Sequence, residues 1–128
     1  MSSESLHEKA ETLGAGVIDT HRAIVSLMEE LEAVDWYNQR AKATSDPTLR
    51  AILEHNRDEE KEHAAMALEW LRRNDSKFAE HLKTFLFTDG PITEIEADMV
   101  KGDGAGESVS QDGSLGIGSL RSAKEASK

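Results

Sequence analysis

Residues 57–63, RDEEKEH, carry five side chains that can bind a cation. They are the carboxylates and the imidazole of Asp58, Glu59, Glu60, Glu62 and His63. Oxygen donors with an imidazole suit iron or manganese when several converge on one site. The same residues dispersed around a helix are ordinary solvated surface. Which of them face the interior therefore decides the chemistry.

Helical rotation, about 100° per residue, divides this stretch into three groups. Glu60 falls within an apolar stripe, with His63 at the flank of that stripe. The stripe is formed by Leu49, Leu53, Ala64, Ala67 and Leu71. Glu59 and Glu62 gather with His55 on another face. Arg57, Asp58 and Lys61 are interpreted as solvated surface.

The preceding helical stretch has one carboxylate in the same situation. Glu30 lies within an apolar stripe, whereas Glu29 and Glu32 point elsewhere. The stripe consists of Ala23, Ile24, Leu27, Leu31, Val34 and Tyr37. Each of the two long helices thus places one glutamate among apolar side chains.

A carboxylate buried alone costs several kcal/mol, so it requires a proton, a base or a cation. No Lys or Arg shares the face of Glu60 or lies within two turns of Glu30 on its face. A metal ion is therefore the expected partner. A lone Glu together with a Glu-x-x-His unit is half of the di-iron pattern of helix bundles. A twofold-symmetric dimer would complete the site with Glu30, Glu60 and His63 from each copy.

The elements that must position these residues are predicted to be helices, which makes the fold class all-α. A first helix is expected over residues 6–42, firm from Val17, and a second from Pro47 to about Arg73, capped by Asp46. A shorter third helix should reach about Phe87, followed by a turn at residues 88–91 and a few helical residues from Ile92.

Three segments are predicted along the chain. They are a helical domain at 1–98, a Gly/Ser/Asp linker at 99–113 and a tail at 114–128.

Composition limits the partners. The 128 residues carry a formal net charge of −10, which disfavours nucleic acid and anionic membranes and favours cations. The absence of cysteine excludes disulfides and thiolate metal sites. No apolar leader or membrane-spanning stretch is present in the sequence, so a cytoplasmic protein is expected.

Three segments and a tail motif carry a family resemblance. RAIVSLMEELEAVDWYNQRA (22–41), HNRDEEKEHAAMALEWLRRND (55–75) and FLFTDGPITEIEA (85–97), followed by SLGIGSLR (114–121), resemble the encapsulated ferritins. These are ferritin relatives carried as cargo inside encapsulin nanocompartments. The resemblance implies a hairpin of two long helices with a shorter third helix. It also implies dimers that assemble into a ring. The ring is expected to be a decamer, and another closed array of dimers remains an alternative.

The resemblance also implies a function. It is a ferroxidase that oxidises Fe(II) with O₂ at a di-iron centre between subunits and delivers iron for mineral storage in the shell. The ligand positions of the family fall on Glu30, Glu60 and His63, with Tyr37 beside the centre. Secondary metal positions, where calcium or another divalent ion is an alternative occupant, fall on Glu29, Glu32, His55, Glu59 and Glu62. Residues Ser114–Arg121 resemble the encapsulin-targeting peptide, which would place the protein in the cytoplasm inside the compartment.

Other interpretations stay open. A rubrerythrin-like di-iron oxidase or peroxidase would use the same ligands, although a Cys-rich rubredoxin module is missing from the sequence. A metal-free helical module could use its acidic surface to bind a basic partner. Glu59 and Glu62 are equally compatible with acidic surface, and Tyr37 with ordinary core.

Overall fold

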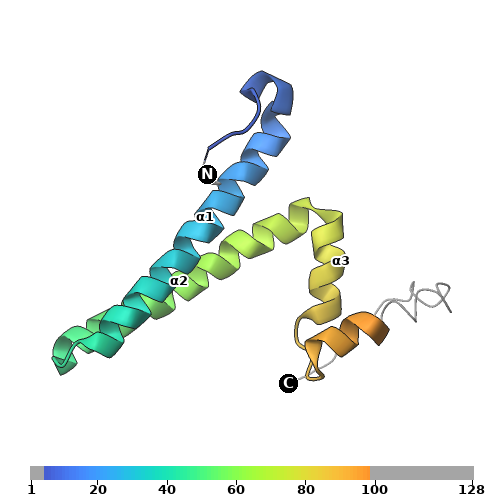
Figure 1. Cartoon of the computed structure of the whole chain (residues 1–128). Coiled ribbons are helices and arrows are strands. Elements are labelled where there is room, and N and C mark those ends of the chain that lie inside the picture. Colours follow the sequence, from blue (N-terminus) through green and yellow to red (C-terminus); the bar gives the residue numbers. More distant parts are fainter. Residues whose placement is uncertain (1–4, 99–128) are drawn as a thin grey trace. The chain divides into compact units, whose positions relative to one another are not determined.

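The computed structural model describes residues 5–98, and all the regular elements in that range are helical. They are α1 (Ala10–Ala43), α2 (Pro47–Asn74) and α3 (Ser76–Phe85), and a further helical stretch begins at residue 92 and reaches residue 98. The prediction of an all-α fold is confirmed. Figure 1 shows α1 and α2 running in opposite directions from the short connection at residues 44–46.

The start of α1 differs from the prediction. The helix begins at Ala10 rather than near residue 6, and Gly14 interrupts it just after its first turn with a φ of 82° and a ψ of 166°. The amides of Thr12 and Leu13 donate to the carbonyl of Lys9 before this break. Glycine tolerates positive φ without a Cβ clash. The regular part of the helix therefore follows the glycines, as predicted from Val17 onward.

The connection to α2 confirms the predicted cap. The Asp46 carboxylate accepts hydrogen bonds from the amides of Thr48 (2.9 Å) and Leu49 (3.4 Å). Pro47 occupies the first helical position, where its missing N–H leaves no bond unmade. The cap fixes where α2 starts, and through the helical repeat it fixes which of its side chains face α1.

The third helix also begins as predicted but ends earlier. Asp75 caps α3 by accepting from the Phe78 amide at 2.9 Å. The helix ends at Phe85 rather than near Phe87, because Phe87 has a φ of 62° and so leaves the helical region. The described chain divides into two compact units, one ending at Ala79 and the other beginning at Glu80. The predicted division into residues 1–98, 99–113 and 114–128 stays a prediction, and its last two segments lie outside the described residues.

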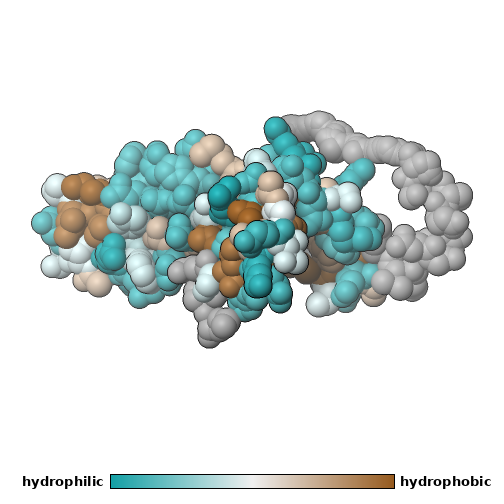
Figure 2. Space-filling view, turned by 90° about the horizontal axis from the view of Figure 1, so that it is seen from above, coloured by the Kyte–Doolittle hydropathy of each residue, from teal (hydrophilic) through white to brown (hydrophobic). Residues whose placement is uncertain are grey.

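A single hairpin buries very little. Among the described residues only Ala41, Ala64 and Leu71 are buried hydrophobic residues. Large apolar side chains remain exposed on both long helices, including Ile24 (42 %), Leu31 (55 %) and Ile52 (52 %). Figure 2 shows such apolar side chains, in brown, on the outer surface. Exposed apolar side chains of this number are typical of surfaces that bind another protein.

Candidate metal centre

Three predicted ligands meet between the two long helices. Glu30 lies in the middle of α1, and Glu60 and His63 lie one turn apart on α2. Because the helices are antiparallel, the midpoints of α1 and α2 face each other. One donor atom from each residue lies within 4.8 Å of the others. No second group of three or more acidic or histidine ligands is this close in residues 5–98.

The cluster is tight but open on one side. The Nδ1 of His63 lies 3.1 Å from Oε1 of Glu60 and 3.7 Å from Oε1 of Glu30. The side chains are 23 % exposed for Glu60, 30 % for Glu30 and 40 % for His63. The dry environment that we expected from the sequence is thus not reached within one chain. A covering surface would have to complete it.

The three groups shift one another's protonation. The hydrogen bond with Glu60, and then burial, raise the pKa of Glu30 above its usual range. The hydrogen bond with Glu30 lowers the pKa of Glu60, and the hydrogen bond with His63 lowers it further. The hydrogen bond with Glu60 also raises the pKa of His63. The hydrogen bond between Glu30 and Glu60 requires a proton that the two carboxyl groups share, and a protonated His63 beside them would offset part of the remaining negative charge.

This donor set fits a hard or borderline divalent cation. Two carboxylates and one imidazole match the ligands that iron and manganese take in helix bundles. The geometry also matches half of a di-iron site, with one lone Glu and one Glu-x-x-His unit. A cation that entered the cluster would displace the shared protons and would turn mutual repulsion of the carboxylates into attraction.

The predicted secondary residues lie elsewhere. Nε2 of His55 lies 4.0 Å from Oε2 of Glu59, and the two side chains are 71 % and 50 % exposed. Glu29, Glu32 and Glu62 are exposed on the helices. These five residues are not brought together into a three-ligand group within the described part of the chain. Their role as secondary metal positions stays a prediction.

Tyr37 is half-buried and lies two helical turns beyond Glu30 on α1. The guanidinium of Arg40 lies 5.3 Å from the centroid of its ring, a distance typical of a cation–π contact. Its predicted position beside a completed centre stays a prediction.

Arg57 is the residue that the sequence interpretation placed wrongly. Asp58 and Lys61 are well exposed, at 59 % and 57 %, as predicted for solvated surface. Arg57 is only 22 % exposed, and its Nη1 donates to Oδ1 of Asn38 on α1 at 3.0 Å. It precedes Glu60 by three residues, which places it about 60° from Glu60 around the helix. That rotation was a signal for an inward position, because a long side chain can reach across to the next helix.

Comparison with known proteins gives consistent matches. The model of the EncFtn-like family matches residues 5–89. The chain is 64 % identical over 126 residues to the encapsulated ferritin-like protein of Rhodospirillum rubrum, covering 94 % of this chain and 90 % of the relative. It is 35 % identical over 105 residues to the encapsulin nanocompartment cargo protein EncC of Myxococcus xanthus, covering 76 % of this chain and 80 % of the relative.

A solved structure shares the fold. The crystal structure of protein ne0167 from Nitrosomonas europaea is 60 % identical to this chain and superimposes with a TM-score of 0.66. The match covers 68 % of this chain and 96 % of that one.

Proposed function

The chain belongs to the EncFtn-like family, and from this premise we propose that it is a ferroxidase that works as cargo inside an encapsulin nanocompartment. The membership confirms the resemblance to the encapsulated ferritins. The names of the relatives from Rhodospirillum rubrum and Myxococcus xanthus support the cargo role. The observation that carries the enzymatic part is the cluster of Glu30, Glu60 and His63.

The active centre forms between two copies of the chain. One copy supplies three ligands, whereas a di-iron centre of this class takes two lone carboxylates and two Glu-x-x-His units. A twofold axis beside the cluster doubles the ligand set without any further residue type. The exposed apolar side chains of Ile24, Met28 and Leu31, close to Glu30 in the sequence, supply surface that the second copy covers.

Covering the cluster also changes its electrostatics. Removing water strengthens the attraction between the carboxylates and a divalent cation and makes an empty, fully charged site costly. Fe(II) is then bound as substrate by the oxygens of Glu30 and Glu60 and the imidazole of His63. Each bound Fe(II) gives up one electron, and O₂ is the acceptor. Tyr37 orients groups near the centre, and the secondary residues guide cations toward it.

The product is delivered to the shell. Fe(III) leaves the ring of dimers, expected to be a decamer, and collects as mineral inside the encapsulin compartment in the cytoplasm. Residues Ser114–Arg121 bind the inner face of the shell through the apolar anchors Leu115, Ile117 and Leu120. These residues lie outside the described part of the structure. Many copies per ring raise the avidity of the contact.

Aerobic titration with Fe(II) tests the enzymatic proposal. Fe(III) formation and O₂ consumption are followed for the wild type and for the Glu30→Ala, Glu60→Ala and His63→Ala variants. We expect the oxidation rate of each variant to fall at least about 10- to 100-fold below that of the wild type. Losses of that size are typical even for residues that only support the metal ligands. Glu11→Ala, which removes a carboxylate from the first turn of α1, is the matched control. Equal rates in all five proteins would refute the ligand assignment, and a wild-type rate at background would refute the ferroxidase.

Deletion of Ser114–Arg121 tests the cargo proposal separately. The truncated protein is expected to oxidise iron as the full chain does but to stay outside the shell when both are produced together. Shells purified by sedimentation are assayed for the cargo. Loading that survives the deletion would refute the targeting role and leave the iron chemistry standing.

A further inference from the structure

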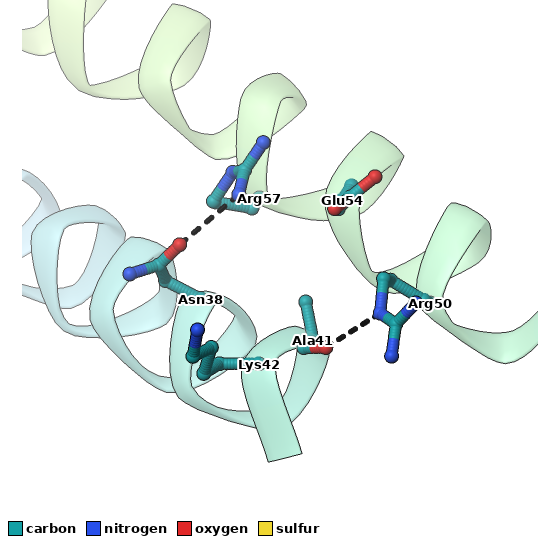
Figure 3. A pocket seen from close by; sticks show the side chains of 6 residues that line it. All are labelled: Asn38, Ala41, Lys42, Arg50, Glu54 and Arg57. Atoms are coloured by element: carbon teal, nitrogen blue, oxygen red, sulfur yellow. Dashed lines mark hydrogen bonds between the residues drawn. The ribbon is translucent and has the colours of Figure 1, made fainter. Parts of the chain in front are cut away.

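A second polar site lies nearer the closed end of the hairpin, apart from the cluster of Glu30, Glu60 and His63. A pocket of about 340 Å³ opens between the last turns of α1 and the first turns of α2. Its lining residues are Asn38, Ala41, Lys42, Arg50, Glu54 and Arg57. Figure 3 shows three of them coming from each helix around an open centre.

The charge around this pocket is opposite in sign to the net charge of the chain. The chain carries a formal charge of −10, but the pocket is lined by three cations and a single carboxylate, that of Glu54. Asp58 pairs with Arg57 at 2.9 Å and, together with Glu54, offsets two of the three positive charges, which leaves the surroundings of the pocket net positive. The local sign of charge therefore indicates an anionic ligand, the opposite of what the metal centre attracts.

Both arginines are held in place before any ligand arrives. Arg50 donates from Nε to the carbonyl oxygen of Ala41 at 3.1 Å and from Nη2 to that of Thr44. These bonds occupy carbonyl oxygens at the end of α1 that would otherwise repel an anion. Arg57 is fixed by Asn38 on one side and by Asp58 on the other. Figure 3 marks the bonds of Arg50 to Ala41 and of Arg57 to Asn38.

Fixed guanidinium groups are good receptors for oxoanions. Each guanidinium has five N–H donors, and the bonds above leave donors of Arg50 and Arg57 for a ligand. A planar fork that is already oriented loses little side-chain entropy on binding and matches the spacing of phosphate oxygens. The exposed side chain of Lys42 adds an ammonium to the lining of the pocket. We propose that this pocket binds a small tetrahedral oxoanion, for which inorganic phosphate is the probe.

Phosphate binding to the iron-free, full-length protein tests the proposal by isothermal titration in chloride buffer. We expect saturable binding with a Kd of about 1 mM or tighter. Lys42→Ala should weaken it about two- to tenfold, and Glu54→Gln, which removes the carboxylate that lines the pocket, should strengthen it by a similar factor. Lys83→Ala removes an equal charge from α3 and should leave the Kd unchanged. Because no iron is present, the outcome is independent of ferroxidase activity.

Several outcomes would overturn the site. One is the absence of saturable binding up to about 20 mM phosphate, well above the expected Kd. Another is a Kd that Lys42→Ala and Glu54→Gln leave unchanged while circular dichroism shows an intact helical fold. Acetate that competes as well as phosphate would assign the pocket to carboxylates instead. Binding that appears only after dissociation of the oligomer would mean that a second copy fills the pocket.

Discussion

Two regions of the same hairpin handle their charged groups differently. In the middle, Glu30, Glu60 and His63 lie close together, and a hydrogen bond with Glu60 raises the pKa of Glu30. Nearer the closed end, Arg50 donates to backbone carbonyls and Arg57 to the side chain of Asn38. In the proposed centre, a metal ion and a second chain would neutralise the charge of the first group. The second group forms its hydrogen bonds within one chain, and so it can stabilise the hairpin without a second chain.

This difference between the two regions indicates that the closed end of the hairpin serves stability and its middle serves function. Bonds between charged donors and carbonyls hold the two helices in register, and this register brings α1 and α2 ligands opposite each other. The ligands themselves repel when charged and contribute little to holding the hairpin closed. Changes at the closed end should therefore act on folding, and changes around the middle should act on assembly and iron chemistry.

The largest effect should come from blocking the second chain without touching a ligand. Leu31→Asp places a charge on an apolar side chain that is 55 % exposed beside Glu30. We expect the dimer to dissociate and iron oxidation to fall more than about tenfold, since each centre would lose half of its ligands. Sedimentation and O₂ consumption are measured together.

Leu31→Met keeps the apolar surface and serves as the control for this change. A monomeric Leu31→Asp protein that oxidised iron at the wild-type rate would contradict the half-site account and would place the whole centre in one chain.

A smaller effect, confined to folding, is expected at Arg50. Arg50→Ala removes the hydrogen bonds to the carbonyls of Ala41 and Thr44 and should lower the free energy of unfolding by about 2 kcal/mol. Urea denaturation of the metal-free protein measures it. Iron oxidation per folded chain should stay near the wild-type value well below the melting temperature. A stable Arg50→Ala variant with lost activity would reverse the roles of the two regions.

The smallest effect concerns surface charge distant from both regions. Arg72 and Arg73 lower the pKa of Glu69 from 4.5 to about 2, so ionised Glu69 stabilises the fold above pH 4.5, and this contribution is lost as the pH falls toward 2. Because Glu69 is 40 % exposed, solvent screens most of the effect. Glu69→Gln should lower the melting temperature by at most about 4 °C near pH 6.

The difference between wild type and Glu69→Gln should shrink below pH 4.5, as followed by circular dichroism. A difference that grew as the pH fell would show that Glu69 acts through something other than its ion pairs with Arg72 and Arg73.

The sequence was sufficient for the features that depend on helical rotation and local caps. Asp46 and Pro47 define the start of α2, and the 100° repeat then brings Glu60 and His63 to the side that faces Glu30. Pairing of the helices follows from the short connection between them. These steps use interactions within a few residues, which a sequence displays directly.

Features that depend on tertiary contact were not predictable in the same way. Helical rotation turns Arg57 toward α1, but its partner there, Asn38, is known only once the two helices are paired. Phe87 ends α3 early through a positive φ that no residue pattern indicates. The pocket beside Arg50 likewise depends on how far apart the two helices lie. The number of chains that complete the metal centre depends on surfaces outside a single chain.

The most direct test of the central claim is a crystal structure of the oligomer grown with Fe(II), with iron located by its anomalous signal. We predict iron near a twofold axis, coordinated by Glu30, Glu60 and His63 from each of two chains. Iron held by the ligands of one chain alone, or bound away from these three residues, would contradict it.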